Sequence, residues 1–267
     1  MTALAVARPT PSAIRQWWVL TVRVIAPTIR TGELFIAIAL SVAFTASLYI
    51  PLKQIMGAVV QGSYAQWIMP SICLQAVYFA AMSGALRSAT DSVHGINRRL
   101  ASMPVPPAAP MAARMSGNLY RCATALTTAI ICGHVIGFRF YLGPGYIVAF
   151  CALVLLIGLI LSFVGDLVGR VSTNPEATTH ILLLPELIWG VLSVGIQPAD
   201  QFPEWIQPVV RNQPHSQFVY ALRSFAGNSE ATAAMPSISV VGPALAWILG
   251  ILLVTAWLYA RVLRRRR

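Results

Sequence analysis

Long apolar runs separated by short polar segments make up most of the chain. The six longest runs are Leu34–Ile50, Trp67–Leu86, Cys122–Phe138, Tyr146–Val164, Ile181–Ile196 and Ile238–Leu258. Each approaches the roughly 20 residues that a helix needs to cross the hydrocarbon core of a bilayer. Lipid offers the backbone no hydrogen-bond partner, so a run that crosses a membrane must satisfy its own backbone as a helix. The pattern therefore predicts an all-α membrane protein with six transmembrane helices.

The segment before the first run has a helical pattern of its own. Its basic and apolar side chains fall into different sectors of a helical wheel: Arg15, Arg23 and Arg30 in one, and Trp17, Leu20, Val24 and Ile25 in the other. Such a helix lies in the headgroup plane, where Trp17 and Trp18 favour the interface. We expect an interfacial helix that Pro27 bends into the first span, and a disordered arm with a chance pattern is the alternative. The chain is thus divided into an N-terminal arm, 1–33, and a transmembrane domain, 34–267.

The longest polar segment between two runs extends from Arg87 to Arg121 and carries five arginines against one aspartate. Apolar and basic side chains of its first half fall on different sides of a helix: Val93, Ile96 and Leu100 against Arg98 and Arg99. We expect an amphipathic helix over Asp91–Met103, which Pro106 and Pro107 stop because proline cannot continue the hydrogen-bond ladder. A basic loop that only fixes topology would carry the same charge, but it would not need this length.

Two further polar segments flank the fifth run. Residues 165–180 form a short connector in which Asn174 and Pro175 mark a turn before the next helix. Gln197–Ser237 alternates prolines, aromatics and apolar pairs, which predicts short amphipathic helices resting in the outer leaflet, with tryptophan at the headgroup level. The residues that we expect to form this outer cap are Pro198, Pro203, Trp205, Pro214 and Arg223.

The distribution of basic residues predicts how the chain is oriented in the membrane. Only 10% of the residues are charged, against about 25% in soluble domains, and mean hydropathy is +0.70. Fifteen of the 19 lysines and arginines lie in 1–33, 87–121, 165–180 and 259–267. Basic residues favour the cytoplasmic side, so both termini are expected there, in a multi-pass protein of a bacterial inner membrane. The net charge of +11 is an orientation signal and predicts no nucleic-acid partner.

Polar groups inside the spans are candidates for a substrate path. Small residues of the first span, such as Ala43 and Ser47, permit close helix approach, and we expect Pro51 to end that span. Gln75 and Tyr78 lie three residues apart, on one side of a helix. They line a cavity or make interhelical hydrogen bonds. His134 is interpreted as a packing or interface residue.

Glu186 is the one carboxylate inside an apolar run, and Trp189 follows it closely. Ionisable groups within a membrane are costly, so function is the default interpretation. A hydrated position near the inner interface is the alternative, because Glu186 comes early in its run. The four cysteines, Cys73, Cys122, Cys132 and Cys151, show no spacing of a metal site and are interpreted as small apolar residues.

ATP binding is not expected in this chain. A P-loop needs Gly-Lys-Ser/Thr to hold phosphates, and the single lysine, Lys53, follows Leu52 in a predicted outer loop. Motifs of membrane-embedded enzymes are also missing: Ala81-Met82-Ser83-Gly84 lacks the first glycine of a rhomboid G-x-S-G, and there is no H-E-x-x-H. A non-catalytic chain is expected. An embedded enzyme and a passive channel or scaffold subunit are the alternatives.

The order of these elements resembles the ABC-2 type transporter permeases, most of all the daunorubicin/doxorubicin-resistance type of actinobacteria. Gly95 to Leu100 followed by Met103-Pro104-Val105 is similar to that family's G-x-x-x-x-L-x-x-x-P-V coupling pattern. A second similar stretch begins at Pro185 and runs through Gln197-Pro198, Pro203-Glu204-Trp205, Asn212-Gln213-Pro214 and Leu222-Arg223 to Gly227. Ser193 and Gly195 depart from the usual adjacent Ser-Gly.

The resemblance implies a half-transporter that exports an apolar or amphiphilic substrate, a drug or a cell-envelope lipid. Its implied partners are a second, identical or homologous ABC-2 permease and two copies of an ABC ATPase subunit that binds ATP and Mg, within membrane lipid. The expected ATPase-coupling residues are Asp91, His94, Gly95, Asn97, Arg98, Arg99, Leu100 and Pro104, with Asn174 and Pro175 as a second docking point. The expected substrate path contains Ala43, Ser47, Gln75, Tyr78, Glu186 and Trp189.

Overall fold

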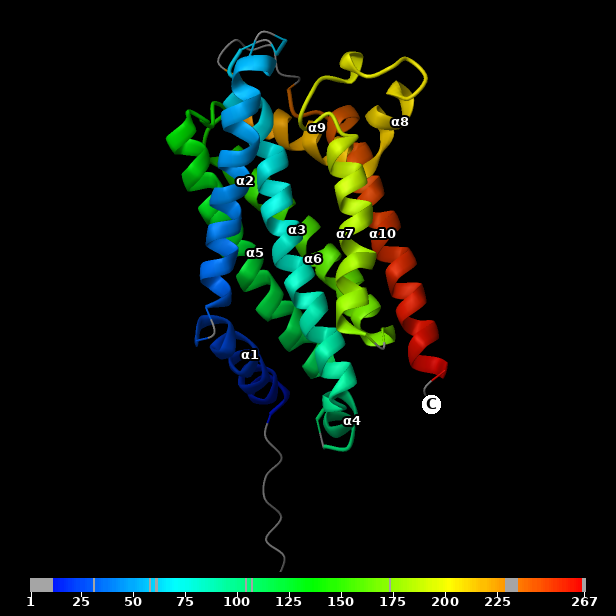
Figure 1. The fold of residues 1–267 in the computed structure, drawn as a ribbon. Coiled ribbons are helices and arrows are strands. Elements are labelled where there is room, and N and C mark those ends of the chain that lie inside the picture. The colour runs from blue at the N-terminus through cyan, green and yellow to red at the C-terminus, as the bar shows by residue number, and fades with distance from the viewer. Residues whose placement is uncertain are drawn as a thin grey trace, which may run out of the picture.

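The computed structural model describes residues 12–265 except 31, 58, 61, 104, 107, 173 and 229–234. Every regular element of these residues is a helix (Figure 1). In chain order they are α1 Ala13–Arg30, α2 Glu33–Met56, α3 Tyr64–Val93, α4 Ile96–Ala101, α5 Ala108–Ile136, α6 Pro144–Val171, α7 Pro175–Val191, the 3-10 turn η1 Ala199–Gln201, α8 Gln207–Asn212, α9 Pro214–Ala226 and α10 Ile238–Arg265. The predicted all-α class is confirmed.

Five of the described helices, α2, α3, α5, α6 and α10, are long and apolar enough to cross a membrane. The fifth predicted span, Ile181–Ile196, differs from the structure. Helix α7 begins earlier, at Pro175, and ends at Val191, and residues 192–196 form turns. With 17 residues it is about 26 Å long at 1.5 Å per residue, shorter than the other five. The sixth crossing therefore stays a prediction.

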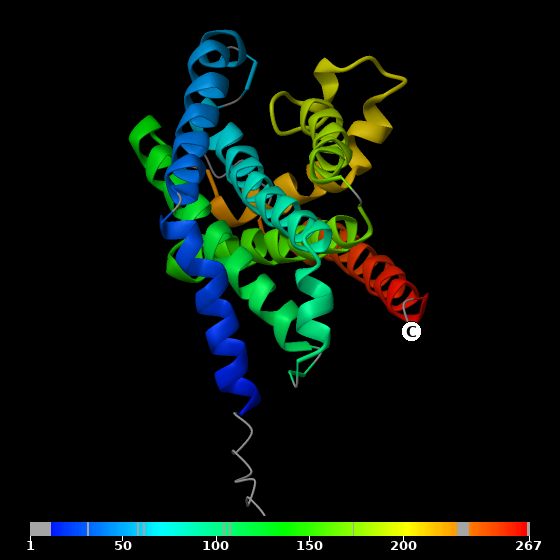
Figure 2. The same ribbon diagram turned by 60° about the horizontal axis from the view of Figure 1, so that its bottom comes forward.

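The helices form an elongated bundle with two distinct ends. The lower end in Figure 1 carries α1, α4 and the end of α10, and the upper end carries η1, α8 and α9. Figure 2 turns the bundle and shows α2 and α7 on opposite sides of α3. The structure thus places α1 and the C-terminal end of α10 at the same end as the α4 segment.

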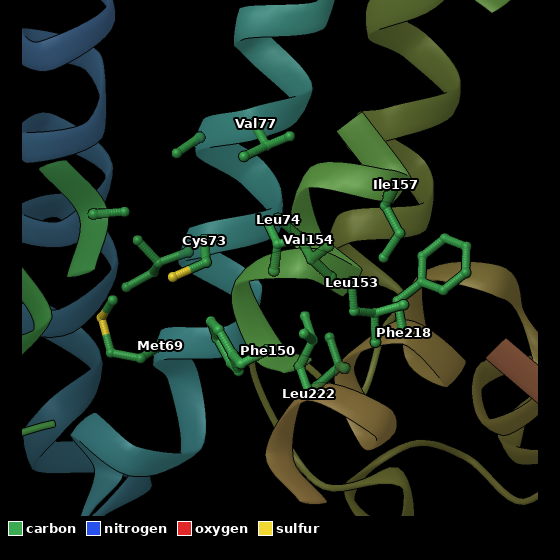
Figure 3. Close-up of a cluster of buried hydrophobic side chains, with 14 of the residues drawn as sticks. Met69, Cys73, Leu74, Val77, Phe150, Leu153, Val154, Ile157, Phe218 and Leu222 are labelled. Carbon is green, nitrogen blue, oxygen red and sulfur yellow. The ribbon is translucent and has the colours of Figure 1, made fainter. Parts of the chain in front are cut away.

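Helix α3 is the centre of the bundle. In its most apolar window 72% of the residues are buried, against 11% in α2 and 17% in α10. It contacts α2, α5, α6, α7 and α9. Figure 3 shows Leu74 of α3 in one apolar cluster with Phe150 and Val154 of α6 and with Phe218 and Leu222 of α9, while Met69 points to the other side, toward Gly133 of α5. The apolar core therefore lies between α3, α6 and α9.

Small residues bring α3 and α6 close together. Gly165 and Gly169 of α6 are spaced as in the G-x-x-x-G packing motif of membrane helices. A Cβ on Gly165 would lie 2.8 Å from the Cβ of Ala85, and one on Gly169 would lie 2.6 Å from the Ala85 carbonyl oxygen and 2.9 Å from the Ala89 nitrogen. The two backbones can approach this closely because these positions carry no side chain.

A buried charge cluster joins four helices near the lower end. The Asp166 carboxylate of α6 accepts from Ser88 of α3 at 2.8 Å and from Tyr259 of α10 at 3.1 Å. It also pairs with Arg114 of α5 at 2.8 Å and with Arg170 at 2.9 Å.

The predicted connector 165–180 is wrong in its first half, because α6 continues to Val171 and so includes Asp166. Glu186 is consequently not the only embedded carboxylate.

Two prolines do not act as the sequence indicated. Pro27 and Pro51 both lie inside helices, α1 and α2, which continue to Arg30 and Met56. Each proline removes one helical hydrogen bond, a loss that helices at a membrane tolerate. The chain changes direction at Gly32 instead, whose φ of +75° lies in the left-handed region that glycine adopts without strain.

The α3–α6 contact predicts the effect of one added methyl group. Gly169→Ala should lower the free energy of unfolding by about 2 kcal/mol, because the new Cβ meets backbone atoms that cannot move separately from their helix. The measurement is thermal unfolding of the purified protein in detergent. Gly250→Ala in α10 is the control, since a Cβ there meets nothing within 4 Å. Equal unfolding temperatures for both variants would contradict the packing account.

Candidate functional site

The expected helix Asp91–Met103 is divided in two. Helix α3 continues to Val93, and α4 covers only Ile96–Ala101. Gly95 separates them with a φ of +70°, which ends one helix and re-aims the chain before the next. The prediction of one continuous helix is wrong, and Asp91 belongs to the last turn of α3. The short helix α4 nevertheless projects from the lower end of the bundle (Figure 1).

The expected coupling residues surround this break. His94 and Arg99 are exposed, while Leu100 lines a cavity of about 240 Å³ between α1, α3, α4 and α5. Asn174 caps α7: its side-chain oxygen accepts from the Glu176 backbone N–H at 2.9 Å, and Pro175 begins the helix. The side chains of Asn97 and Arg98, and all of Pro104, lie outside the described residues.

A larger cavity of about 600 Å³ opens between α2 and α3. Its apolar wall comes from both helices: Ile36, Ala37, Leu40, Ala76, Phe79, Ala80, Met82 and Leu86. Its polar lining is sparse: Ser41, Ser83, Thr90, Arg87, Asp91, Arg121 and Thr179. Ile36 and Leu86 are 62% and 41% exposed, so the cavity is accessible from the side of the bundle. Such a volume with few polar groups suits a drug-sized apolar ligand.

The predicted path residues divide between two places. Three of them meet between α3 and α7. The Tyr78 hydroxyl donates to the Leu182 carbonyl oxygen at 2.5 Å. A Cβ on Gly190 would lie 3.8 Å from Gln75 Oε1 and 4.0 Å from Glu186 Oε1, so both side chains approach this glycine. Gln75, Tyr78 and Glu186 therefore form one polar cluster, although none of them lines the 600 Å³ cavity.

The other three path residues lie on the outside. Ala43 and Ser47 of α2 are exposed, seven residues beyond Ile36 and Leu40 of the cavity wall and hence on the same side of the helix. Trp189 of α7 is 46% exposed, three residues after the buried Glu186. These three side chains face the outside of the bundle.

The sequence alone gave no sign of His215, which completes the polar cluster from α9. Its Nδ1 lies 4.0 Å from Glu186 Oε1, and the Glu186 side chain is 6% exposed. Burial, with a smaller effect from Arg223, lowers the pKa of His215 to about 4. The imidazole is therefore neutral at pH 7 and places no positive charge beside the carboxyl group.

Arg223 of α9 holds the upper end together. Its Nε donates to the Trp67 carbonyl oxygen at 3.0 Å, and its Nη2 donates to those of Val194 and Gly195 at 2.8 and 3.3 Å. The guanidinium also lies 3.6 Å from the centre of the Trp67 ring, a cation–π contact. Burial lowers the pKa of Arg223 to about 9, so the group stays charged at pH 7.

The remaining cap residues take varied positions. Pro198 precedes η1 and Pro214 begins α9, where it is buried. Pro203 is exposed, and Trp205 is 78% exposed at the outer surface. The predicted short helices of this region are confirmed as η1, α8 and α9. The placement of Trp205 at a headgroup level stays a prediction.

Helix α1 packs against α5 through one side. Its buried residues are Thr21 and Thr28, and Arg121 of α5 donates to the Thr28 hydroxyl at 2.9 Å. Arg15, Trp18 and Arg23 are exposed, and Trp17 is half-buried. The exposed arginines and tryptophan agree with a helix at the membrane interface. No contact in the structure tests that position, so it stays a prediction.

Comparison with known proteins gives one consistent result. Residues 29–261 match the sequence profile described as ABC-2 family transporter protein. The chain is 45% identical over 259 residues to the doxorubicin resistance ABC transporter permease protein DrrB of Mycobacterium tuberculosis, covering 94% of this chain and 90% of that one.

Two further similar proteins carry related names. The probable doxorubicin resistance ABC transporter permease protein DrrC of the same organism is 28% identical over 222 residues, or 82% of this chain and 77% of that one. The daunorubicin resistance ABC transporter permease protein DrrB1 of Streptomyces coeruleorubidus is 27% identical over 163 residues, or 60% and 56%.

The geometry of Arg223 predicts that lysine cannot replace it. Arg223→Lys should lower the free energy of unfolding by about 2 kcal/mol, because a single ammonium cannot reach three carbonyl oxygens and stack on Trp67 together. Thermal unfolding in detergent measures the change. Arg211→Lys in α8, where the side chain is exposed, should stay within about 0.5 kcal/mol of the wild type. An equal loss in both variants would contradict the role of Arg223.

Proposed function

The chain belongs to the ABC-2 family of transporter permeases, and we propose that it is the membrane subunit of an ATP-driven exporter of amphiphilic molecules. The observation that carries the proposal is the cavity of about 600 Å³ between α2 and α3. A large apolar molecule already dissolves in the membrane, so a transporter needs a lateral opening more than a site that faces water. Apolar walls with a few polar groups suit such a ligand.

The energy for export comes from a separate ABC ATPase, as in other ABC permeases. This chain carries no Gly-Lys-Ser/Thr sequence, so it has no P-loop with which to hold ATP. We propose that two ATPase subunits bind ATP and Mg and dock at the lower end of the bundle, on α4 and on the connector before α7. That end is then cytoplasmic, in agreement with the distribution of arginines.

A second permease would complete the transporter. Helix α7 contacts α3 but leaves a continuous apolar surface exposed, formed by Ile181, Leu184, Leu187, Ile188 and Val191. We propose that a second ABC-2 permease, identical or homologous, faces this surface and encloses the space between α2 and α7. Ala43, Ser47 and Trp189 would then line the enclosed route together with Gln75, Tyr78 and Glu186.

The cavity and the similar proteins support an amphiphilic substrate. Their names concern resistance to doxorubicin and daunorubicin, and such compounds are amphiphilic. A drug of this kind or an amphiphilic lipid of the cell envelope fits an apolar cavity with a polar edge. We propose export from the inner leaflet of the bacterial inner membrane, with membrane lipid in contact with α1 and with α8–α9.

The docking proposal predicts the behaviour of an α4 variant. Gly95→Glu with Leu100→Glu should lower the recovery of the ATPase with the purified permease by about tenfold, the loss of one interface anchor. The measurement is the amount of ATPase that co-purifies with equal amounts of membrane-inserted permease. The purified permease alone should hydrolyse no ATP.

Asp200→Arg is the control, because it changes an exposed charge at the opposite end of the bundle. It should leave the recovery of the ATPase unchanged. Wild-type recovery in the α4 variant would remove α4 as the docking surface. Hydrolysis of ATP by the permease alone would contradict the proposed function itself.

A further inference from the structure

Among the described residues, Glu186 of α7 has no partner of opposite charge. Its Oε1 is buried without a hydrogen-bond partner there, and only 6% of the side chain is exposed. His215 is the one basic side chain that the described part of the chain places within 4.0 Å of this carboxylate. That imidazole is neutral at pH 7, because burial lowers its pKa to about 4. A carboxylate removed from water is costly unless a cation or hydrogen-bond donors compensate it, and Glu186 lacks both at Oε1.

A small space beside Gly190 is bordered by two oxygen atoms. A Cβ on Gly190 would lie 3.8 Å from Gln75 Oε1 and 4.0 Å from Glu186 Oε1, which are ordinary van der Waals distances. The glycine thus leaves room for one methyl-sized group, and it is itself partly exposed, so the space is accessible from outside α7. We call this space the acceptor gap. An ammonium group has the size of a methyl group and carries only donors, whereas the two bordering oxygens are acceptors.

The acceptor gap lies on the same sides of α3 and α7 as the cavity of about 600 Å³. Thr179 of α7 lines that cavity, and Glu186 follows seven residues later, on the same side of the helix and about 10 Å farther along its axis. On α3, Gln75 lies four residues before Phe79 and seven before Met82, and both of these line the cavity. The two helices therefore lead from the apolar cavity wall to the two oxygens, toward the upper end of the bundle.

We propose that the acceptor gap binds the ammonium group of a cationic amphiphile, whose apolar body extends into the cavity between α2 and α3. The inference rests on the proposed function and names the class of molecule that the route accepts, an amphiphilic amine. The ammonium group donates to Glu186 and Gln75 and supplies the positive charge that Glu186 lacks. The cavity's Arg87 does not oppose this, because it follows Gln75 by 12 residues, about 18 Å along α3.

Binding of radiolabelled dodecylammonium to the purified permease tests this inference. The measurement is made at pH 7 in a neutral maltoside detergent, with protein-free micelles as the blank, and binding should saturate. Dodecanol and dodecanoate, of the same chain length, should compete at least about tenfold more weakly, because one has no charge and the other has a negative charge. Equal competition by dodecanol would mean that Glu186 needs no cation, and it would overturn the inference.

Glu186→Gln removes the charge and keeps the shape of the side chain. The Kd for dodecylammonium should rise by about tenfold or more, because a charge-assisted hydrogen bond is lost. Glu176→Gln is the control, since it removes an exposed carboxylate from the first turn of the same helix. That variant should keep the Kd within about twofold of the wild type. An unchanged Kd in the Glu186 variant would show that the ammonium group does not bind there.

Gly190→Ala separates binding from stability. The new methyl group occupies the acceptor gap and leaves Glu186 in place, so the Kd for dodecylammonium should rise by about tenfold. The unfolding temperature should stay the same or rise, because the contacts of the methyl group are ordinary and alanine favours a helix more than glycine does. Gly250→Ala in α10, where a Cβ meets nothing within 4 Å, should bind as the wild type does. Wild-type affinity in the Gly190 variant would contradict the placement of the ammonium group.

Recovery of the ATPase, measured on the same preparation, separates this inference from the proposed function. Loss of that recovery in the wild type counts against the proposed function. Normal recovery without a preference for dodecylammonium counts against this inference alone. Preferential binding, together with ATP-dependent movement of dodecylammonium across vesicles that contain the permease and its ATPase, supports both.

Discussion

The close contact between α3 and α6 is the constraint on which the rest of the structure depends. Gly165 and Gly169 let the two backbones approach, and lipid offers no hydrophobic drive between helices, so such packing supplies the attraction. Once α3 is fixed on α6 and α5, its other side faces α2 and α7. That side carries part of the cavity wall and the side chains of Gln75 and Tyr78, which meet Glu186 of α7.

Each end of the bundle adds polar contacts that hold the helices in register. Asp166 joins α3, α5, α6 and α10 at the lower end, and Arg223 joins α9 to the start of α3 at the upper end. Both charged groups are surrounded by partners, as a charge removed from water requires. Between these two clusters, α7 packs mainly on α3, whereas α2 packs on both α3 and α5.

The hydrophobic runs predicted the long helices, because the length and the apolar composition of a helix are local properties of the sequence. The same reasoning missed Asp166 and His215, whose burial depends on partners from helices far away in the sequence. It also placed the end of the first span wrongly at Pro51 and the change of direction before that span at Pro27 instead of Gly32, because proline is only a local signal. It joined α3 to α4 across Gly95. The coupling residues and the path residues stay predictions, although the structure brings Gln75, Tyr78 and Glu186 together as their common polarity suggested.

The central claim is that an amphiphile passes through the cavity between α2 and α3. The most direct measurement is ATP-dependent movement of a fluorescent amphiphile across vesicles that contain the permease and its ATPase, with Ser83→Trp filling the cavity. Transport should fall to about a tenth or less at an unchanged amount of complex, because an indole occupies much of a ligand-sized cavity. Ala246→Trp, on the exposed side of α10, should transport as the wild type does. Wild-type transport by the Ser83 variant would contradict the account.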